Sequence, residues 1–138
     1  MRSLTLASIA LSTGLALALP ARAAETPSQE LTSLLQCAAA SGLYNGFVEA
    51  PDSSPTDADK ALVAQMAAVD MRFQMREQIL ADSLGDAAVQ QVVTGIKADM
   101  SAKIEPLRAH VDPRREVIDL YRPVMVACIA RGATLPAT

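Results

Sequence analysis

Two methionines and a histidine are the residues of this sequence best suited to bind a metal. Met71 and Met75 are four residues apart, so a helix would project both thioethers from one side. Thioethers are soft ligands that suit Cu(I), and methionine with histidine can hold haem iron. The only histidine, His110, falls between two prolines. Because methionines at helical spacing usually fill irregular cores, we expect no cofactor, and a copper or haem carrier is the alternative.

The two cysteines, Cys37 and Cys128, are 91 positions apart and do not form a Cys-x-x-Cys motif. That spacing gives no redox signature, whereas an oxidising compartment would join two such cysteines in one intramolecular bond. We therefore expect a structural disulfide between Cys37 and Cys128.

Charge is unevenly distributed along the chain. Arginines gather before and within the last predicted helix, and acidic residues gather around the first predicted junction. The arginines are Arg108, Arg114, Arg115 and Arg122, and the acidic residues are Glu49, Asp52, Asp57 and Asp59. The two groups can pair with each other. Otherwise the arginines form a patch for a small anionic ligand or a protein partner, since guanidinium groups bind anions through paired donors.

The sequence offers no catalytic constellation. A nucleophilic serine would need a base, and the one histidine has no Gly-x-Ser-x-Gly motif to accompany it. The closely spaced acids Asp57 and Asp59, or Asp112 and Glu116, are explained by helix N-termini, where the helix dipole favours negative charge. We therefore predict that the protein is not an enzyme.

The first 23 residues have the pattern of a cleaved signal peptide. Arg2 is followed by an uncharged run from Leu4 to Leu19, and Ala21 and Ala23 provide the small residues before a cleavage site. Removing residues 1–23 also removes Arg2 and Arg22, so the formal net charge falls from −3 to −5. This acidic balance argues against nucleic acid as a partner, and no later apolar run is long enough for a membrane span. We predict a periplasmic or secreted protein with one domain, residues 24–138.

Composition and punctuation predict an all-α domain. Hydrophobic residues make up 51% of the chain and aromatic residues only 3%, which favours helices over a sandwich of strands. N-terminal capping signals at Thr26, around Ser54, at Asp86 and at Asp112 open four helical stretches. We expect Pro106 to end or kink the third stretch near residue 105.

Apolar residues recur at helical spacing in each stretch and define the expected core. These positions are Leu31, Leu34, Leu35, Ala38 and Gly42; Leu62, Met66, Val69, Phe73 and Leu80; Val89, Val92, Val93, Ile96, Met100, Ile104 and Leu107; and Val117, Ile118, Tyr121, Val124, Met125, Cys128 and Ile129. Short connections make consecutive helices antiparallel. The prediction is a small antiparallel four-helix bundle, up-down-up-down, with the last helix kinked at Pro123 and a disulfide between the first and last helices.

Taken together, these features predict an exported helical protein that acts by binding. The expected role is an accessory or protein-interaction module of the cell envelope. The alternative is the periplasmic copper or haem b carrier that would use the methionine and histidine ligands named above.

Overall fold

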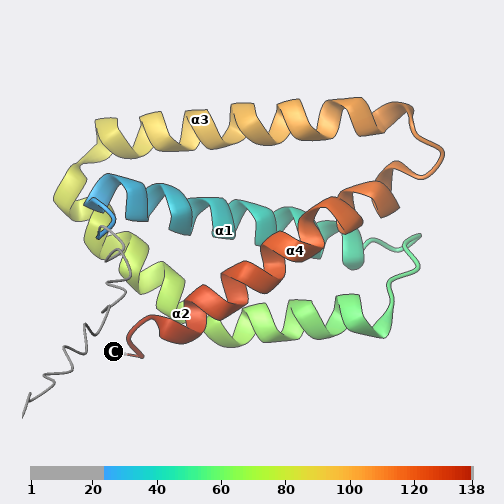
Figure 1. Cartoon of the computed structure of the whole chain (residues 1–138), viewed down its shortest axis with the longest axis horizontal. Helices are drawn as coiled ribbons and strands as arrows, with labels where there is room; N and C mark the ends of the chain where they lie inside the picture. Colours follow the sequence, from blue (N-terminus) through green and yellow to red (C-terminus); the bar gives the residue numbers. More distant parts are fainter. Residues whose placement is uncertain (1–23, 138) are drawn as a thin grey trace, which may run out of the picture.

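The computed structural model describes residues 24–137, and these residues form a bundle of four α-helices (Figure 1). The helices are α1 (Pro27–Val48), α2 (Asp57–Leu84), α3 (Asp86–Ile104) and α4 (Pro113–Thr134), and a 3₁₀ helix, η1 (Glu105–Ala109), joins α3 to α4. Helical residues make up 84% of the part of the chain that the structure describes, and that part contains no strand. The all-α prediction is confirmed.

Local capping chemistry sets most of the helix boundaries. Thr26 and Gln29 form the predicted capping box of α1, and the Asp112 carboxylate caps α4 by accepting from the Arg115 backbone N–H at 3.0 Å. The N-cap of α2 differs from the prediction. Thr56, not Ser54, caps α2, because Asp59 stands three residues after Thr56 and completes a capping box there.

The turn between α2 and α3 uses Gly85 as the cap of both helices, whereas the sequence indicated Asp86 as the N-cap of α3. Gly85 has φ 86°, a conformation that favours glycine, so the chain reverses direction at this single residue. Asp86 is consequently the first residue of α3, where its carboxylate still faces the positive end of the helix dipole.

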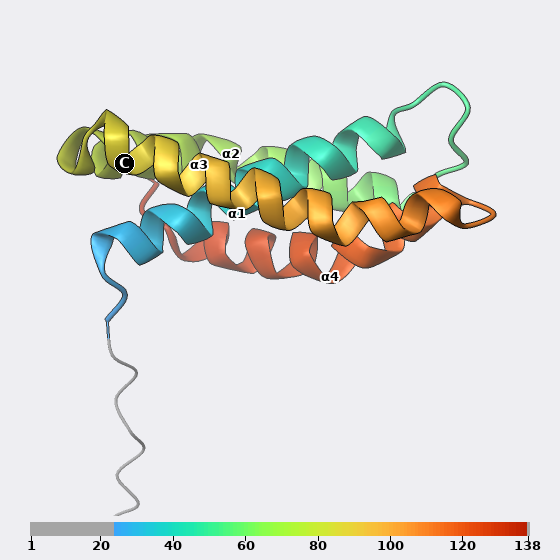
Figure 2. The same ribbon diagram turned by 90° about the horizontal axis from the view of Figure 1, so that it is seen from above.

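Consecutive helices run in opposite directions, and α1, α2 and α4 pack on one another, as the two views in Figures 1 and 2 show. Cys37 of α1 and Cys128 of α4 form the predicted disulfide, with their Cα atoms 5.6 Å apart. Helix α3 lies against α1 and α2 but makes no extended contact with α4 within the described chain. The bundle is therefore a three-helix core with α3 laid along one side of it.

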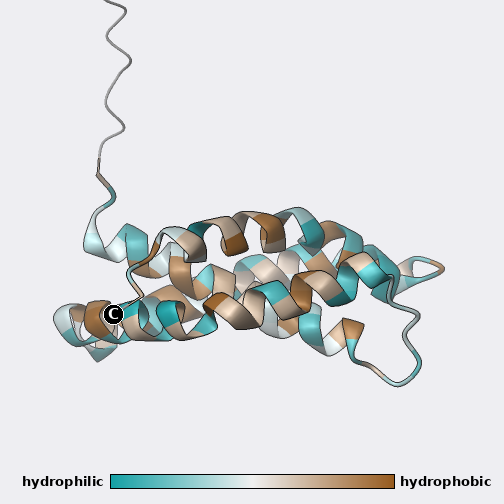
Figure 3. Cartoon of the chain, turned by 90° about the horizontal axis from the view of Figure 1, so that it is seen from below, coloured by the Kyte–Doolittle hydropathy of each residue, from teal (hydrophilic) through white to brown (hydrophobic). Residues whose placement is uncertain are grey.

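Most of the predicted core positions of α2 and α4 are buried, but the prediction was wrong for Val124 of α4, which is 37% exposed. In α2, Met66, Val69, Phe73 and Leu80 are buried. The buried side chains of α4 are Val117, Ile118, Tyr121, Met125 and Cys128. Hydrophobic and hydrophilic segments alternate along the helices in Figure 3, as expected of amphipathic helices.

The core face of α1 differs from the prediction. Ala38 and Gly42 are exposed, and Cys37, Ala40 and Tyr44 are buried instead. The disulfide fixes Cys37 toward α4, so the inward face of α1 is rotated away from the stripe that the leucine spacing suggested. In α3 the predicted stripe faces inward, but Ile96 is its only fully buried residue.

The helices accommodate Pro106 and Pro123 in different ways. Helix α3 ends at Ile104, directly before the η1 turn that contains Pro106, as predicted. Helix α4 is one continuous helix with Pro123 inside it. A kink at Pro123 is the expected consequence of the missing hydrogen bond to the Asp119 carbonyl.

The predicted signal peptide, residues 1–23, lies outside the described residues. Within the part of the chain that the structure does describe, no helix has the length and apolar character needed to cross a membrane.

Candidate functional site

The predicted arginine and acidic groups meet at one end of the bundle, around the carboxylate of Asp59. Asp59 is completely buried, with 0% of its surface exposed. Its Oδ1 atom accepts from the Tyr44 hydroxyl at 2.8 Å and from Arg122 Nη2 at 2.8 Å, and its Oδ2 atom accepts from Arg115 Nη1 at 3.2 Å. Three helices thus converge on a single buried carboxylate.

Local sequence places each member of this cluster. Asp59 is the third residue of α2, so the capping box holds its Oδ2 atom 3.0 Å from the Thr56 backbone N–H. Tyr44 lies one turn before the end of α1. Arg115 and Arg122 are seven residues apart in α4, a spacing of two turns that puts both guanidinium groups on the same side of the helix.

The electrostatics keep Asp59 ionised. Burial raises the pKa of Asp59, but the hydrogen bonds from Arg122, Thr56 and Tyr44 outweigh burial and hold its pKa well below the usual range. Burial and the neighbouring Asp59 carboxylate raise the pKa of Tyr44 to about 12. At neutral pH the cluster therefore contains a charged carboxylate and a neutral phenol that donates to it.

The other predicted arginines also have acidic neighbours. Arg114 pairs with Asp52 of the α1–α2 connection, and Arg108 pairs with Glu105 at 3.0 Å on the exposed η1 turn. The first of the two sequence interpretations, pairing between the arginine and acidic groups, is confirmed for Arg114, Arg115 and Arg122. Binding of an anionic ligand or partner at this end stays a prediction, and the arginines there have much of their charge already balanced.

The candidate metal ligands lie on separate parts of the surface. Met71 and Met75 are 67% and 40% exposed on α2, so the expectation that they fill the core was wrong. His110 lies beyond η1, with its Nδ1 atom 3.4 Å from Glu116. The N-terminal end of α2 lies beside the first turn of α4, close to His110 in the sequence. Met75 is 18 residues after the start of α2, which is about 27 Å along the helix from that end. His110 and the methionines therefore do not share a site.

Among the described residues, no group of three or more histidine, cysteine, aspartate or glutamate side chains is placed to hold a metal ion. The two cysteines are joined to each other.

The two methionines belong to a longer apolar strip on the solvent side of α2, which we name the outer face. It consists of Ala61, Ala64, Ala68, Met71, Met75 and Ile79, all of them exposed. Spacings of three and four residues alternate along most of it, as in the seam of a coiled coil. Helix α2 thus has two apolar faces. The inner one packs in the core, whereas the outer one stays largely exposed and has only Pro136 of the C-terminal segment beside Met75 and Ile79 within the described chain.

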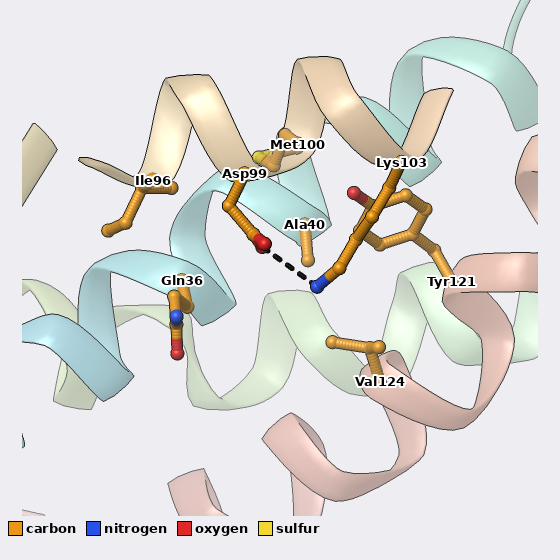
Figure 4. A pocket seen from close by; sticks show the side chains of 8 residues that line it. All are labelled: Gln36, Ala40, Ile96, Asp99, Met100, Lys103, Tyr121 and Val124. Carbon is orange, nitrogen blue, oxygen red and sulfur yellow. Dashed lines mark hydrogen bonds and ion pairs between the residues drawn. The ribbon is translucent and has the colours of Figure 1, made fainter. Parts of the chain in front are cut away.

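A pocket of about 180 Å³ lies between α1, α3 and α4, where α3 stands away from α4 (Figure 4). Its lining is mainly apolar and is contributed by Gln36, Ala40, Ile96, Asp99, Met100, Lys103, Tyr121 and Val124. Tyr121 is 5% exposed, and its hydroxyl has no hydrogen-bond partner among the described residues. The pocket therefore contains a buried polar group whose hydrogen-bonding capacity is unused.

Neither the outer face nor the pocket was predicted from the sequence, for different reasons. The alanines and methionines of the outer face have coiled-coil spacing that is visible in the sequence. The inner seam of α2 has larger apolar residues, so it alone was interpreted as a packing surface. Tyr121 was correctly placed in the core, whereas an empty space beside its hydroxyl depends on how far α3 stands from α4, which no local pattern encodes.

The chain matches no protein-family model, no curated protein and no solved structure. Its function must therefore be argued from its own surfaces, those of a disulfide-clamped bundle of four helices.

Proposed function

We propose that the mature chain, residues 24–138, is an exported accessory protein of the cell envelope that acts by protein–protein contact and not by catalysis. The signal-peptide pattern of residues 1–23 supports export. The Cys37–Cys128 disulfide supports it as well, because such bonds persist in oxidising compartments. The contact that we assign is made by the outer face of α2.

The observation that carries this proposal is the exposure of the outer face. Met71, Met75 and Ile79 are 67%, 40% and 57% exposed and follow one another at intervals of four residues. An exposed row of large apolar side chains costs solubility unless another surface covers it. From Ala61 to Ile79 the strip is about 27 Å long, which matches the length of a second helix laid along it.

The occupant that fits this face is α2 of a second copy of the chain. The outer face has small residues in its first half and large residues in its second half. In an antiparallel pair with its two-fold axis between residues 69 and 70, Ala64 lies opposite Met75 and Ala68 lies opposite Met71 of the other copy. Met71 and Met75 then each meet an alanine, whereas Ile79 lies opposite Lys60 at the end of the contact. The central part of the outer face is therefore self-complementary, as a two-fold symmetric interface requires.

A cross-linking experiment tests this register. Ala64→Cys and Met75→Cys proteins are purified separately, mixed, and oxidised briefly. We expect the mixture to form a disulfide-linked dimer of unlike chains faster than either protein alone links to itself, because residues 64 and 75 face each other across the axis. Ser101→Cys, an exposed position on α3, is the matched control for random collision. Equal rates in all samples would contradict the proposed pairing.

Sedimentation equilibrium tests the association itself. We expect the oxidised mature protein to form dimers at micromolar concentration and Met75→Lys to weaken association at least tenfold, since a lysine would be buried at the seam. Val126→Lys, which alters an apolar residue of α4 that is 53% exposed and outside the outer face, should leave association unchanged. A protein that remains monomeric at 100 µM, roughly a hundredfold above a micromolar Kd, would overturn the proposal.

Copper binding is the second candidate function, and the exposure of Met71 and Met75 favours it. Both thioethers are accessible on one side of α2, and two soft ligands four residues apart can hold Cu(I) with a third ligand from solution. A competition titration against bicinchoninate-bound Cu(I) measures it. Replacing both methionines by leucine should abolish copper binding but preserve the dimer, so this double variant separates the two functions. Among residues 24–137, His110 lies far from both methionines, so these three residues do not form a pair of axial ligands for haem.

A further inference from the structure

The pocket between α1, α3 and α4 contains the strongest unassigned feature of the molecule, the unpartnered hydroxyl of Tyr121. Tyr121 is 95% buried, and its hydroxyl oxygen is screened from solvent but bonds to no atom of the described chain. A buried polar group without a partner destabilises a protein, and each such group calls for an explanation. Tyr121 lines an open space of about 180 Å³, and a ligand atom in that space reaches the hydroxyl once a neighbouring side chain moves aside.

A second polar group stands at the mouth of this pocket. Lys103 of α3 extends across the opening beside the Tyr121 ring, as Figure 4 shows, and its Nζ atom lies 2.7 Å from the Asp99 carboxylate. Lys103 and Asp99 are 56% and 52% exposed, so their ion pair is screened by water and is readily exchanged for another partner. A cation and a hydroxyl donor therefore converge at one edge of the space.

The remaining wall is apolar apart from Gln36 of α1. Ile96 and Met100 of α3 face Val124 of α4 across the pocket, with α1 as its floor (Figure 4). Val124 also lines a neighbouring groove between α1 and α4 that continues to the disulfide. An apolar body can thus begin at the pocket and extend along α4. Such a mainly apolar site with a few convergent polar groups is the usual form of a small-molecule site.

We propose that this pocket binds a small monocarboxylic acid with an apolar tail. The ligand carboxylate accepts from the Tyr121 hydroxyl and replaces Asp99 as the partner of Lys103. The tail lies between Ile96, Met100 and Val124. Burial raises the pKa of Tyr121, which keeps the phenol protonated and able to donate at neutral pH. This site is separate from the outer face of α2, so it stands independently of the dimer.

Calorimetric titration of the oxidised mature protein with octanoate tests the assignment. We expect one octanoate per chain, at least tenfold weaker binding in Tyr121→Phe and in Lys103→Met, and at least tenfold weaker binding of octylamine, which has the same tail but a cationic head. Lys97→Met, an exposed lysine of α3 outside the pocket, is the matched control and should bind octanoate as the unaltered protein does.

The same variants provide a readout without ligand. Because the Tyr121 hydroxyl lacks a partner, Tyr121→Phe should leave the Tm of the unliganded protein unchanged or raise it. Octanoate should then raise the Tm of the unaltered protein but not that of Tyr121→Phe. Equal binding of octanoate by all variants, equal binding of octylamine, or absence of binding at millimolar octanoate would overturn the proposal. A lowered Tm in unliganded Tyr121→Phe would also overturn it, because the hydroxyl would then have a partner.

Discussion

The buried carboxylate of Asp59 should be one of the most sensitive single positions of the fold, and Asp59→Ala tests this. The substitution removes the acceptor of the fully buried Tyr44 hydroxyl, a hydrogen bond to a charged group that contributes roughly 1.5–3 kcal/mol. It also removes half of the α2 capping box, which contributes about 1 kcal/mol. Arg115 and Arg122 are about one third exposed and can bind water or Asp119 instead. The loss of their ion pairs with Asp59 therefore adds less than about 1 kcal/mol to the cost.

The expected cost is therefore about 3 to 5 kcal/mol, a large share of the 5–15 kcal/mol typical of whole domains. Urea unfolding of the oxidised protein, followed by far-UV circular dichroism, measures it. Asp57→Asn is the matched control. Asp57 is in the same first turn of α2 but is fully exposed, so this variant should stay within about 0.5 kcal/mol of the unaltered protein.

A double-mutant cycle isolates the Tyr44 contact. Tyr44→Phe alone should cost about 1 to 2 kcal/mol, because Asp59 retains its other donors. In the Asp59→Ala background the same change should cost little or nothing, since the hydroxyl has already lost its acceptor, which gives a coupling of about 1 kcal/mol or more. Additive effects of the two substitutions, or an Asp59→Ala protein as stable as the Asp57→Asn control, would refute the role assigned to this cluster.

Three further outcomes follow from the packing and the charges. Reducing the α1–α4 disulfide with dithiothreitol should lower the free energy of unfolding by about 4 to 5 kcal/mol, since the bond closes a loop with a sequence separation of 91; an unchanged urea midpoint would contradict this. Gly132→Ala should destabilise by about 1–3 kcal/mol in the same assay, because an added Cβ would stand 2.6 Å from the Phe73 ring, whereas Gly95→Ala on open surface should not destabilise. The lowered pKa of Asp59 means that its ionised form stabilises the fold above about pH 4 and that this contribution is lost as pH falls toward the folded-state pKa. Between pH 7 and pH 2 the unaltered protein should therefore lose more stability than Asp59→Ala does, and parallel losses would argue against the assignment.

The features that local chemistry determines were predictable from the sequence. The Thr26 capping box, the Asp112 cap and the end of α3 before Pro106 each depend on residues within a single turn, so their spacing is enough to place them. The Cys37–Cys128 bond was predictable by elimination, because a chain with two cysteines allows one intramolecular pairing.

The burial of Asp59 was not predictable in the same way. Its position near the start of α2 indicated an acidic residue favoured by the helix dipole, and pairing with arginines was one of two interpretations. Complete burial requires Tyr44 of α1 and Arg122 of α4 to meet it, and the relative positions of three helices set that meeting. Asp57, two residues away with the same side chain, remains exposed.

The methionines show a related limit of helical periodicity. A helix with apolar residues on two faces gives two patterns, and only the neighbouring helices decide which face is covered. In α2 the seam of Met66, Val69 and Phe73 packs inward, which leaves Met71 and Met75 on the opposite side. The sequence therefore predicted the inner seam correctly and assigned the exposed methionines to the core.

The uneven coverage of α3 links the fold to the pocket. The stripe of α3 is regular, yet Ile96 is its only fully buried residue, because α3 packs on α1 and α2 without the extended α4 contact that a symmetric bundle would provide. The disulfide holds α4 to α1, so α4 cannot shift toward α3 to close the space without distorting the three-helix core. The opening beside Tyr121 is consequently a result of the disulfide between α1 and α4. A bound apolar tail would supply the contacts that α3 lacks on α4.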